Sequence, residues 1–336
     1  MSLRRFPALY PGVFRPRKLR CGTVPHRPRW PREHDKSGRA ARGHGAHGGG
    51  AVSARLRGIA RQTEQIVAEG AYRAPGGHEV PIAARLRAAC EGTRIHGPEP
   101  VPVSAVRVTR TVVEVTGESS LEAARRLGGQ VAVLNFASAR NPGGGYLNGA
   151  QAQEEALCRA SALYACLLRA RAFYDHHRAH RDPFYTDRVI HSPGVPVFRD
   201  DRGELLDEPY TAGFLTAAAP NAGVVLRTAP ERASELPGAL AVRAERVLET
   251  AAAHGYRGLV LGAWGCGVFR NDPAQVAGAF HGLLGPGGRF AGAFDHVVFG
   301  ILDRTRDRAV LGAFEKVLGG GRAAGPGRGA GVQLQP

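Results

Sequence analysis

The sequence predicts an α/β sandwich in which helices cover both sides of a mixed, largely parallel sheet. Strand-like apolar runs and helix-length segments mostly alternate along the 336 residues, the order typical of this class. The run at 131–136, Val-Ala-Val-Leu-Asn-Phe, is almost continuously apolar, which indicates a strand covered on both faces. Glycine-rich segments follow this run and a second one at 258–262. Loops after the carboxyl ends of such strands are where α/β sheets bind ligands.

The individual elements are predicted from the spacing of apolar residues and from helix caps. The segment 105–115 largely alternates apolar and polar residues, which favours a half-buried strand. A serine cap with Glu122 close behind begins a helix over 118–127, and Gly128 and Gly129 end it. The other predicted strands are 188–192, 214–218, 258–262 and 296–302, and the other predicted helices are 53–70, 78–91, 153–170, 231–254, 273–284 and 306–318.

The formal charge of +16 is concentrated at the N-terminus. Residues 1–50 contain twelve Lys and Arg against Glu33 and Asp35, so they carry +10 and the rest of the chain carries +6. This segment is rich in Pro, Gly, Arg and His and lacks a helical or strand period, so we expect 1–50 to be disordered. A basic segment can bind nucleic acid through phosphates, although a solvated extension, or sequence translated upstream of the true start, is the simpler interpretation. We expect 51–318 to form one domain and 319–336 to be a disordered tail.

Composition also bears on compartment and cofactors. No apolar run approaches the roughly 18 residues that span a bilayer, and the N-terminus lacks the apolar region of a secretory signal, so we expect a soluble, cytoplasmic protein. The five cysteines are widely spaced without a C-x-x-C pair, which favours a reducing compartment and argues against a zinc site. His191 and His254 have no ligand partner at helical spacing, so structural or surface roles are expected. The prediction is therefore no cofactor and no metal.

The most informative segment is 141–155, Asn-Pro-Gly-Gly-Gly-Tyr-Leu-Asn-Gly-Ala-Gln-Ala-Gln-Glu-Glu. Glycines allow a backbone to fold closely around a polar group, and Glu154 and Glu155 follow at the start of a predicted helix. Acids there also complement the helix dipole, but the combination with three glycines favours a site. The spacing of the dinucleotide-binding and Walker motifs is absent.

These residues carry a resemblance to a known family. The triple glycine, seven intervening residues and Gln-Glu-Glu resemble the signature of poly(ADP-ribose) glycohydrolases. The sequence from Leu134 to Arg159 is similar to the bacterial branch of that family, and 191–200, 217–221 and 261–273 are similar to further blocks of it. The resemblance covers about residues 55–318. It implies a macrodomain fold, a three-layer α/β/α sandwich, with an N-terminal helical extension.

The resemblance also implies roles for individual residues. Glu155 would be the catalytic acid, Glu154 would bind hydroxyls of the ribose at the scissile bond, and Gln153 would help to hold that loop. The loop from Gly265 to Phe269 would wrap the diphosphate, and Asn135 corresponds loosely to an asparagine that holds the ribose. The implied substrate-binding residues are Gly143, Gly144, Gly145, Gln153, Asn135, Gly265, Cys266, Gly267, Val268 and Phe269.

The implied reaction is hydrolysis of the O-glycosidic ribose–ribose bond of poly(ADP-ribose), which releases ADP-ribose. Such cleavage needs a proton for the leaving oxygen and stabilisation of an oxocarbenium-like centre. Adjacent helical residues project about 100° apart, so Glu154 and Glu155 are not expected to flank one bond as a glycosidase pair. One Glu acting as general acid and base, with a positioned water and no metal, fits better.

Two alternatives remain open. The chain can instead remove mono-ADP-ribose linked to protein or DNA, or it can be a binding module, since many macrodomains hold ADP-ribose without cleaving it. The intact Gln-Glu-Glu argues against binding alone. The expected partners are poly(ADP-ribose) or ADP-ribose and ADP-ribosylated proteins, with ADP-ribosylated nucleic acid as an alternative, and the expected state is a monomer that does not contact a membrane.

Overall fold

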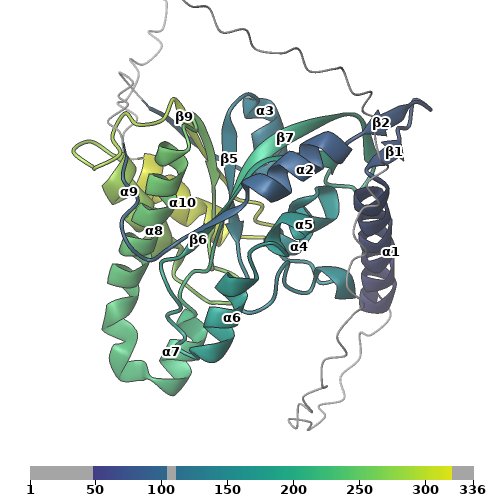
Figure 1. Cartoon of the computed structure of the whole chain (residues 1–336). Coiled ribbons are helices and arrows are strands. Elements are labelled where there is room, and N and C mark those ends of the chain that lie inside the picture. The colour runs from purple at the N-terminus through teal and green to yellow at the C-terminus, as the bar shows by residue number, and fades with distance from the viewer. Residues whose placement is uncertain (1–47, 104–110, 320–336) are drawn as a thin grey trace, which may run out of the picture. The chain divides into compact units, whose positions relative to one another are not determined.

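The computed structural model describes residues 48–103 and 111–319 (Figure 1). The chain divides into two units, Met1–Gly45 and Ala46–Pro336, and all described residues belong to the second. The predicted disordered segments 1–50 and 319–336 lie almost wholly outside the described residues. Among the residues that are described, no helix is both long enough and apolar enough to cross a membrane.

A mixed seven-stranded sheet forms the centre of the second unit, with the strand order β3-β6-β7-β5-β8-β9-β4. The pairings among β7, β5, β8, β9 and β4 are parallel, and β3 and β6 are added antiparallel at one edge. The strands are β3 Arg94–His96, β4 Val112–Thr116, β5 Val131–Phe136, β6 Val189–Arg199, β7 Leu205–Ala217, β8 Gly258–Leu261 and β9 His296–Gly300. The mixed, largely parallel sheet predicted from the sequence is confirmed.

Two hydrophobic cores, one on each face of the sheet, make the fold a three-layer sandwich. Alternate residues of β5 divide between them, Val133 to one core and Leu134 to the other, because successive strand residues point to opposite faces. Figure 1 shows α8, α9 and α10 on one side and α2, α4 and α5 on the other. The helices are α1 Gly48–Glu69, α2 Ala83–Gly92, α3 Ser120–Leu127, α4 Gln153–Ala160, α5 Leu163–Leu167, α6 Arg171–Ala179, α7 Ala222–Thr228, α8 Leu236–Ala253, α9 Pro273–Leu284 and α10 Ala309–Leu318.

Several elements follow the sequence prediction closely. Helix α3 begins with a complete capping box, in which Ser119 Oγ accepts from Glu122 N and Glu122 Oε2 accepts from Ser119 N. Strand β5 is buried on both faces along most of its length. Helix α9 spans the predicted residues and is capped by Asp272. Both glycine loops follow the carboxyl ends of adjacent parallel strands, β5 and β8.

The long helix predicted over 153–170 is wrong, because the chain forms two short helices there, α4 and α5, and a third, α6, begins at Arg171. Ser161 interrupts the first helix: its extended backbone forms a bridge to Val197 of β6, and its Oγ accepts from Leu163 N. Leu157, Leu163 and Leu167 are nevertheless all buried in one core, as their spacing predicted, although they lie on two separate helices. Spacing alone therefore did not reveal the interruption.

Two other predictions need correction. The helix predicted over 78–91 begins only at Ala83, because Glu79–Pro81 forms strand β2, which pairs with β1 Ala71–Arg73. Strands β6 and β7 are far longer than the predicted 188–192 and 214–218, since they form a long antiparallel pair with register shifts. The strand predicted over 105–115 is described only from residue 111, where β4 begins at Val112, and 104–110 lie outside the described residues.

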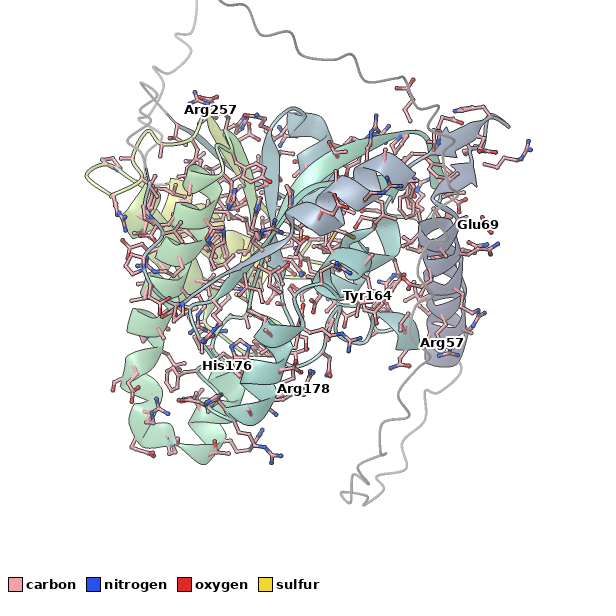
Figure 2. All side chains as sticks on the ribbon, in the orientation of Figure 1. Arg57, Glu69, Tyr164, His176, Arg178 and Arg257 are labelled. Atoms are coloured by element: carbon pink, nitrogen blue, oxygen red, sulfur yellow. The ribbon has the colours of Figure 1, made fainter. Side chains whose placement is uncertain are left out.

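Helix α1 packs against the first glycine loop. Tyr146 from that loop is fully buried, and its hydroxyl donates to the carbonyl of Ala60 and contacts Glu64 Oε1 on α1. On the outer side of the same helix, Glu69 is exposed and Arg57 lies at the edge of the contact (Figure 2). The N-terminal extension therefore supports the loop that precedes the two glutamates.

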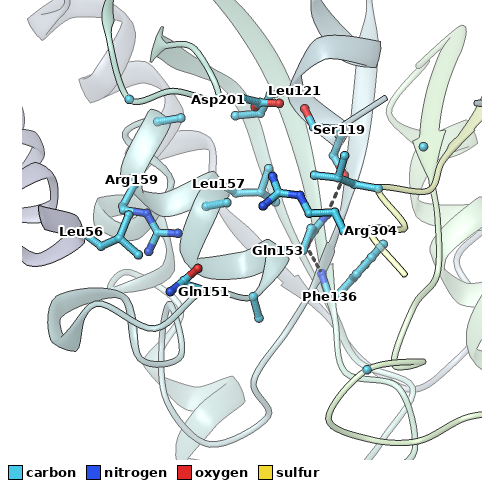
Figure 3. A pocket seen from close by; sticks show the side chains of 18 of the residues that line it. Leu56, Ser119, Leu121, Phe136, Gln151, Gln153, Leu157, Arg159, Asp201 and Arg304 are labelled. Atoms are coloured by element: carbon cyan, nitrogen blue, oxygen red, sulfur yellow. Dashed lines mark hydrogen bonds between the residues drawn. The ribbon is translucent and has the colours of Figure 1, made fainter. Parts of the chain in front are cut away.

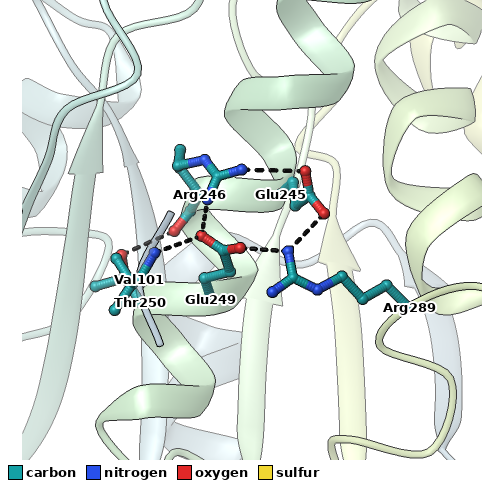
Figure 4. Close-up of polar contacts among 6 residues, drawn as sticks. All are labelled: Val101, Glu245, Arg246, Glu249, Thr250 and Arg289. Atoms are coloured by element: carbon teal, nitrogen blue, oxygen red, sulfur yellow. Dashed lines mark hydrogen bonds and ion pairs between the residues drawn. The ribbon is translucent and has the colours of Figure 1, made fainter. Parts of the chain in front are cut away.

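A buried ion-pair network fixes helix α8 in the second layer (Figure 4). Glu249 is fully buried and is bonded by Arg246, by Arg289 and by the backbone N–H of Val101, the last at 2.9 Å. Arg289 also bonds Glu245 at 2.7 Å. A buried charge is tolerated only when it is paired and hydrogen-bonded, so this network orders the segment before β4 and the loop before β9 around one helix.

We expect Leu134→Ala to lower the free energy of unfolding by about 3 kcal/mol, because it opens a cavity at a fully buried position of the central strand. Urea denaturation measures the loss. Val112→Ala is the control, since Val112 is 47% exposed on β4, and its effect should stay within about 0.5 kcal/mol. Equal losses of unfolding free energy in the two variants would show that Leu134 is not part of a closely packed core on the central strand.

Candidate active site

The three consecutive glycines fold directly over the two glutamates. Gly143 and Gly144 have φ of 65° and 56°, a region that other residues rarely adopt. A Cβ on Gly144 would lie 2.4 Å from Glu155 Oε1 and 3.3 Å from Glu154 Oε2. Glycine is therefore required for both conformation and space, and the carboxylates are the groups around which the loop closes.

Glu154 lies deepest in the site, with 2% of its surface exposed. Its Oε2 accepts from the backbone N–H of Ser138 at 2.7 Å, and its Oε1 accepts from Asn135 Nδ2 at 3.2 Å. Burial raises the pKa of Glu154 to about 8, and the neighbouring Glu155 acts in the same direction. This carboxyl group therefore holds its proton near neutral pH.

Glu155 is held by backbone donors on both of its oxygens. Its Oε1 accepts from the N–H of Gly145 at 2.8 Å, and its Oε2 accepts from the N–H of Ala152 at 3.1 Å. Glu155 is the third residue of α4, and its bond to the N–H of Ala152 caps the N-terminus of that helix. Glu155 is 7% exposed, more than Glu154, so it is the more accessible carboxylate of the pair.

Gln153 and Asn135 connect helix α4, which carries the glutamates, to strand β5. Gln153 Oε1 accepts from Phe136 N at 2.9 Å, and its Nε2 donates to Leu134 O at 2.8 Å, so this side chain joins α4 to β5. Asn135 is fully buried and donates to Glu154 and to Thr216 Oγ1. The structure thus places Asn135 beneath Glu154 rather than on a surface open to a ligand.

The second glycine loop presents free backbone donors. Within the described part of the chain, the N–H groups of Gly265, Gly267, Val268 and Phe269 make no hydrogen bond. Gly265 has φ of 72° and Val268 is 84% exposed at the tip. Consecutive free N–H groups in such a loop form a concave anion-binding site, so these donors can bind a phosphate group.

Buried side chains anchor this loop at both ends. Trp264 Nε1 donates to Ala217 O at 2.9 Å, and Asn271 Nδ2 donates to Pro220 O at 2.8 Å. The ring of Phe269 lies 5.8 Å from that of Tyr185. Burial raises the pKa of Cys266 to about 12, so its thiol stays protonated.

The N-terminus of α9 follows the second loop directly. The second loop leads into α9, whose N-terminus would add its own donors and dipole. Asp272 already caps that helix, because its Oδ1 accepts from Gln275 N at 2.9 Å. The cap takes up one N–H group at the start of α9 and Pro273 has none, so the loop's own N–H groups are the main donors for a phosphate.

A cavity of about 700 Å³ lies beside helix α4 (Figure 3). Gln153, Cys266 and Gly267 line it, whereas Glu154 and Glu155 are outside its lining. Its charged lining consists of five arginines and three aspartates, Arg55, Arg159, Arg199, Arg202, Arg304, Asp200, Asp201 and Asp303. The volume suits a small-molecule ligand, and the excess of arginine favours an anionic one.

The site includes residues that sequence reasoning did not identify. Asn271 anchors the second glycine loop, and Thr216 accepts a hydrogen bond from Asn135. Arg159, on α4, donates to Ala150 O at 2.6 Å, just before that helix begins. The lining residues Asp201 and Arg304 come from distant segments. No local pattern marks these positions, because only the fold brings them to the site.

The structure also brings together three histidines far from one another in sequence. One ring nitrogen from each of His96, His191 and His254 lies within 4.8 Å of the other two. Burial lowers the pKa of His191 to about 3, with His254 and His96 acting in the same direction. The sequence prediction of structural or surface roles rested on the spacing along one helix, which says nothing about contacts between β3, β6 and the end of α8.

A glycine loop closed over a buried acid pair and a second loop with free N–H donors, both at the carboxyl ends of a mixed α/β sheet, define a class of enzymes that cleave bonds in anionic, phosphate-containing ligands. A family model described as "Microbial-type PARG, catalytic domain" matches residues 60–200. A crystal structure of poly(ADP-ribose) glycohydrolase from Thermomonospora curvata shares 50% identity over 79% of this chain and 99% of that chain, with a TM-score of 0.75.

Further solved structures are similar. The Thermomonospora curvata enzyme bound to the inhibitor ADP-HPD has 52% identity, coverage of 78% and 99%, and a TM-score of 0.72. Poly(ADP-ribose) glycohydrolase from Deinococcus radiodurans in complex with ADP-ribose has 46% identity, coverage of 69% and 96%, and a TM-score of 0.64. No curated protein matches the chain. The chain belongs to the microbial-type poly(ADP-ribose) glycohydrolases, and its α/β fold is the macrodomain-like fold of that family.

We expect Gly144→Ala to displace the glutamates, because the new methyl group meets Glu155 Oε1 in a backbone region that favours glycine. The temperature of thermal unfolding and the rate of polymer hydrolysis should both fall. Gly77→Ala is the matched control, since Gly77 has φ of 87° but no atom within 4 Å of a Cβ. It should lose stability from backbone strain alone and keep hydrolysis. Equal loss of hydrolysis in both variants would contradict the close fit of the loop.

The raised pKa of Glu154 predicts a pH dependence of stability. Between its ordinary value of 4.5 and about 8, the unfolded state releases a proton that the folded state keeps. Stability from this group is therefore complete below pH 4.5 and falls by up to roughly 1.4 kcal/mol per pH unit until about pH 8. Glu154→Gln should remove this slope when chemical denaturation is followed from pH 4 to 9. Parallel curves for the two proteins would exclude a buried, protonated Glu154.

Proposed function

We propose that this chain hydrolyses the O-glycosidic ribose–ribose bond of poly(ADP-ribose) with Glu155 as the general acid and base. The observation that carries the proposal is the pair of buried carboxyl groups closed in by Gly143, Gly144 and Gly145. Because the loop backbone approaches both carboxyl groups so closely, it holds the two acids in fixed positions at a reacting centre. Glu155 is the more accessible of the two, so it is the one placed to reach the leaving oxygen.

Binding of the ADP-ribose unit uses the second loop and the adjoining cavity. The free N–H groups of Gly265, Gly267, Val268 and Phe269 bind the diphosphate, and its charge is complemented by arginines of the cavity. Phe269 packs near the distal ribose. The strands that precede the two loops are neighbours, so the diphosphate lies within reach of the ribose held over α4. Structures of family members with ADP-ribose and ADP-HPD support this choice of ligand.

The chemistry needs two proton transfers through Glu155, one to the leaving oxygen and one from the attacking water. Glu155 donates a proton to the leaving ribose oxygen as the glycosidic bond breaks, and the resulting carboxylate then accepts a proton from the attacking water. The bound diphosphate stabilises the positive charge that develops on the ribose. Glu154, whose raised pKa keeps it protonated near neutral pH, donates a hydrogen bond to a hydroxyl of that ribose and so orients it.

The polymer is the substrate we favour over mono-ADP-ribose on protein or DNA, because the family is that of polymer-cleaving enzymes. We further propose that residues 51–318 are the catalytic domain, that ADP-ribosylated proteins are the natural targets, and that the enzyme acts as a cytoplasmic monomer. A product assay on polymer, mono-ADP-ribosylated protein and ADP-ribosylated DNA separates the substrates. Turnover of only the DNA substrate would replace the polymer with nucleic-acid-linked ADP-ribose.

We expect Glu155→Gln to retain ADP-ribose binding and to lose hydrolysis by roughly 10²–10⁴-fold, since the amide fills the same space but cannot donate and accept the proton. Calorimetry with ADP-ribose and a rate assay on polymer measure the two quantities. Glu154→Gln should instead raise KM more than it lowers kcat. Glu79→Gln, on the exposed side of β2, is the control and should match the unmodified chain. Near-normal turnover by Glu155→Gln would refute the assignment.

A further inference from the structure

The cluster of His96, His191 and His254 lies outside the site described above. Cross-strand partners share a face, and His191 pairs with Leu215 whereas Asn135 pairs with Thr216. Leu215 and Thr216 are consecutive and therefore point to opposite faces of the sheet. The histidine cluster thus lies on the face opposite the two glutamates, and the proposed hydrolysis does not use it.

The cluster brings one ring nitrogen from each histidine to within 4.8 Å of the others. His96 Nε2 and His254 Nε2 face each other at 3.0 Å. Two nitrogens on one tetrahedral zinc ion, at bonds of about 2.0–2.1 Å, lie roughly 3.3 Å apart, so a small movement admits the ion. His254 is exposed and His96 is half-buried, which leaves the cluster open to an ion and a water from solvent.

His191 supplies the third nitrogen. Its ring is 3% exposed and stacks on that of His254 with centroids 3.7 Å apart. Lone pairs lie in the ring planes, so the exposed ring of His254 has to rotate out of this stack for both rings to bind one ion. Its Nε2 is bonded to the hydroxyl of Tyr256 at 2.8 Å, while its buried Nδ1 has no hydrogen-bond partner among the described residues. In the tautomer that donates Nε2–H to Tyr256, Nδ1 carries a free lone pair. A partner on the second ring nitrogen is the usual support of a metal-binding histidine.

We propose that His96, His191 and His254 form a binding site for a divalent transition-metal ion such as Zn²⁺, with water as the fourth ligand. Three imidazoles suit this class of ion. The ligands come from β3, β6 and the residue that follows α8. β3 is a three-residue strand at the edge of the sheet. The ion therefore ties the sheet edge to the end of α8 and stabilises the fold.

The test titrates Zn²⁺ by calorimetry into the full chain after removal of metal by a chelator. His254→Asn should weaken one zinc site at least tenfold, and Zn²⁺ should raise the unfolding temperature of the unmodified chain but not of this variant. His176→Asn, on α6 (Figure 2), is the matched control, because it disrupts a pair with His180 whose rings stack at 4.1 Å. The control should bind as the unmodified chain does.

Unchanged zinc affinity and stoichiometry in His254→Asn would overturn the proposal and assign any binding to other histidines of the chain, which has 13. A second measurement needs no variant: Co²⁺ bound to three histidines and water gives the intense visible absorption of a tetrahedral complex, and its absence would equally refute the site. Polymer hydrolysis should persist after chelation, so that failure of the metal site and failure of the proposed activity are separately visible.

Discussion

The burial of two adjacent carboxyl groups beneath a glycine loop sets the requirements that the surrounding structure meets. Removing such groups from water costs several kcal/mol unless hydrogen bonds replace the lost hydration. Backbone N–H groups of Ser138, Gly145 and Ala152 and the amide of Asn135 provide these bonds. Only a glycine loop in the left-handed region can bring its backbone so close, and only a strand end and a helix start side by side can supply donors from both directions.

Helix α1 and the central sheet both contact the segment that contains the first glycine loop and the start of α4. Tyr146 places the loop on α1 through Ala60 and Glu64, and Gln153 fixes the start of α4 to β5. The second loop is fixed separately through Trp264 and Asn271. Each loop is therefore anchored by a side chain buried in the core, Tyr146 in the first and Trp264 in the second, so a change in core packing is transmitted to the site even when the catalytic residues are untouched.

The sequence predicted the features that depend on local pattern. The α3 capping box, the buried β5 and the two glycine loops all follow from short-range chemistry and were confirmed. The break at Ser161 and the long β6–β7 pair depend on contacts with distant strands, which apolar spacing does not record. For the same reason the contacts of His191 and His254 with His96, which lies on another strand, could not be predicted.

The two carboxyl groups differ because their surroundings differ, although they are neighbours in sequence. Glu154 projects toward the strand end and meets Asn135, whose own Oδ1 has no partner among the described residues. Glu155 projects toward the glycine loop and lies nearer to solvent. A rotation of about 100° between consecutive helical residues thus converts one acidic dipeptide into a buried, protonated group and an accessible one. An enzyme that needs one group to orient a sugar and another to move a proton can obtain both from a single helix turn, provided that a glycine loop covers it.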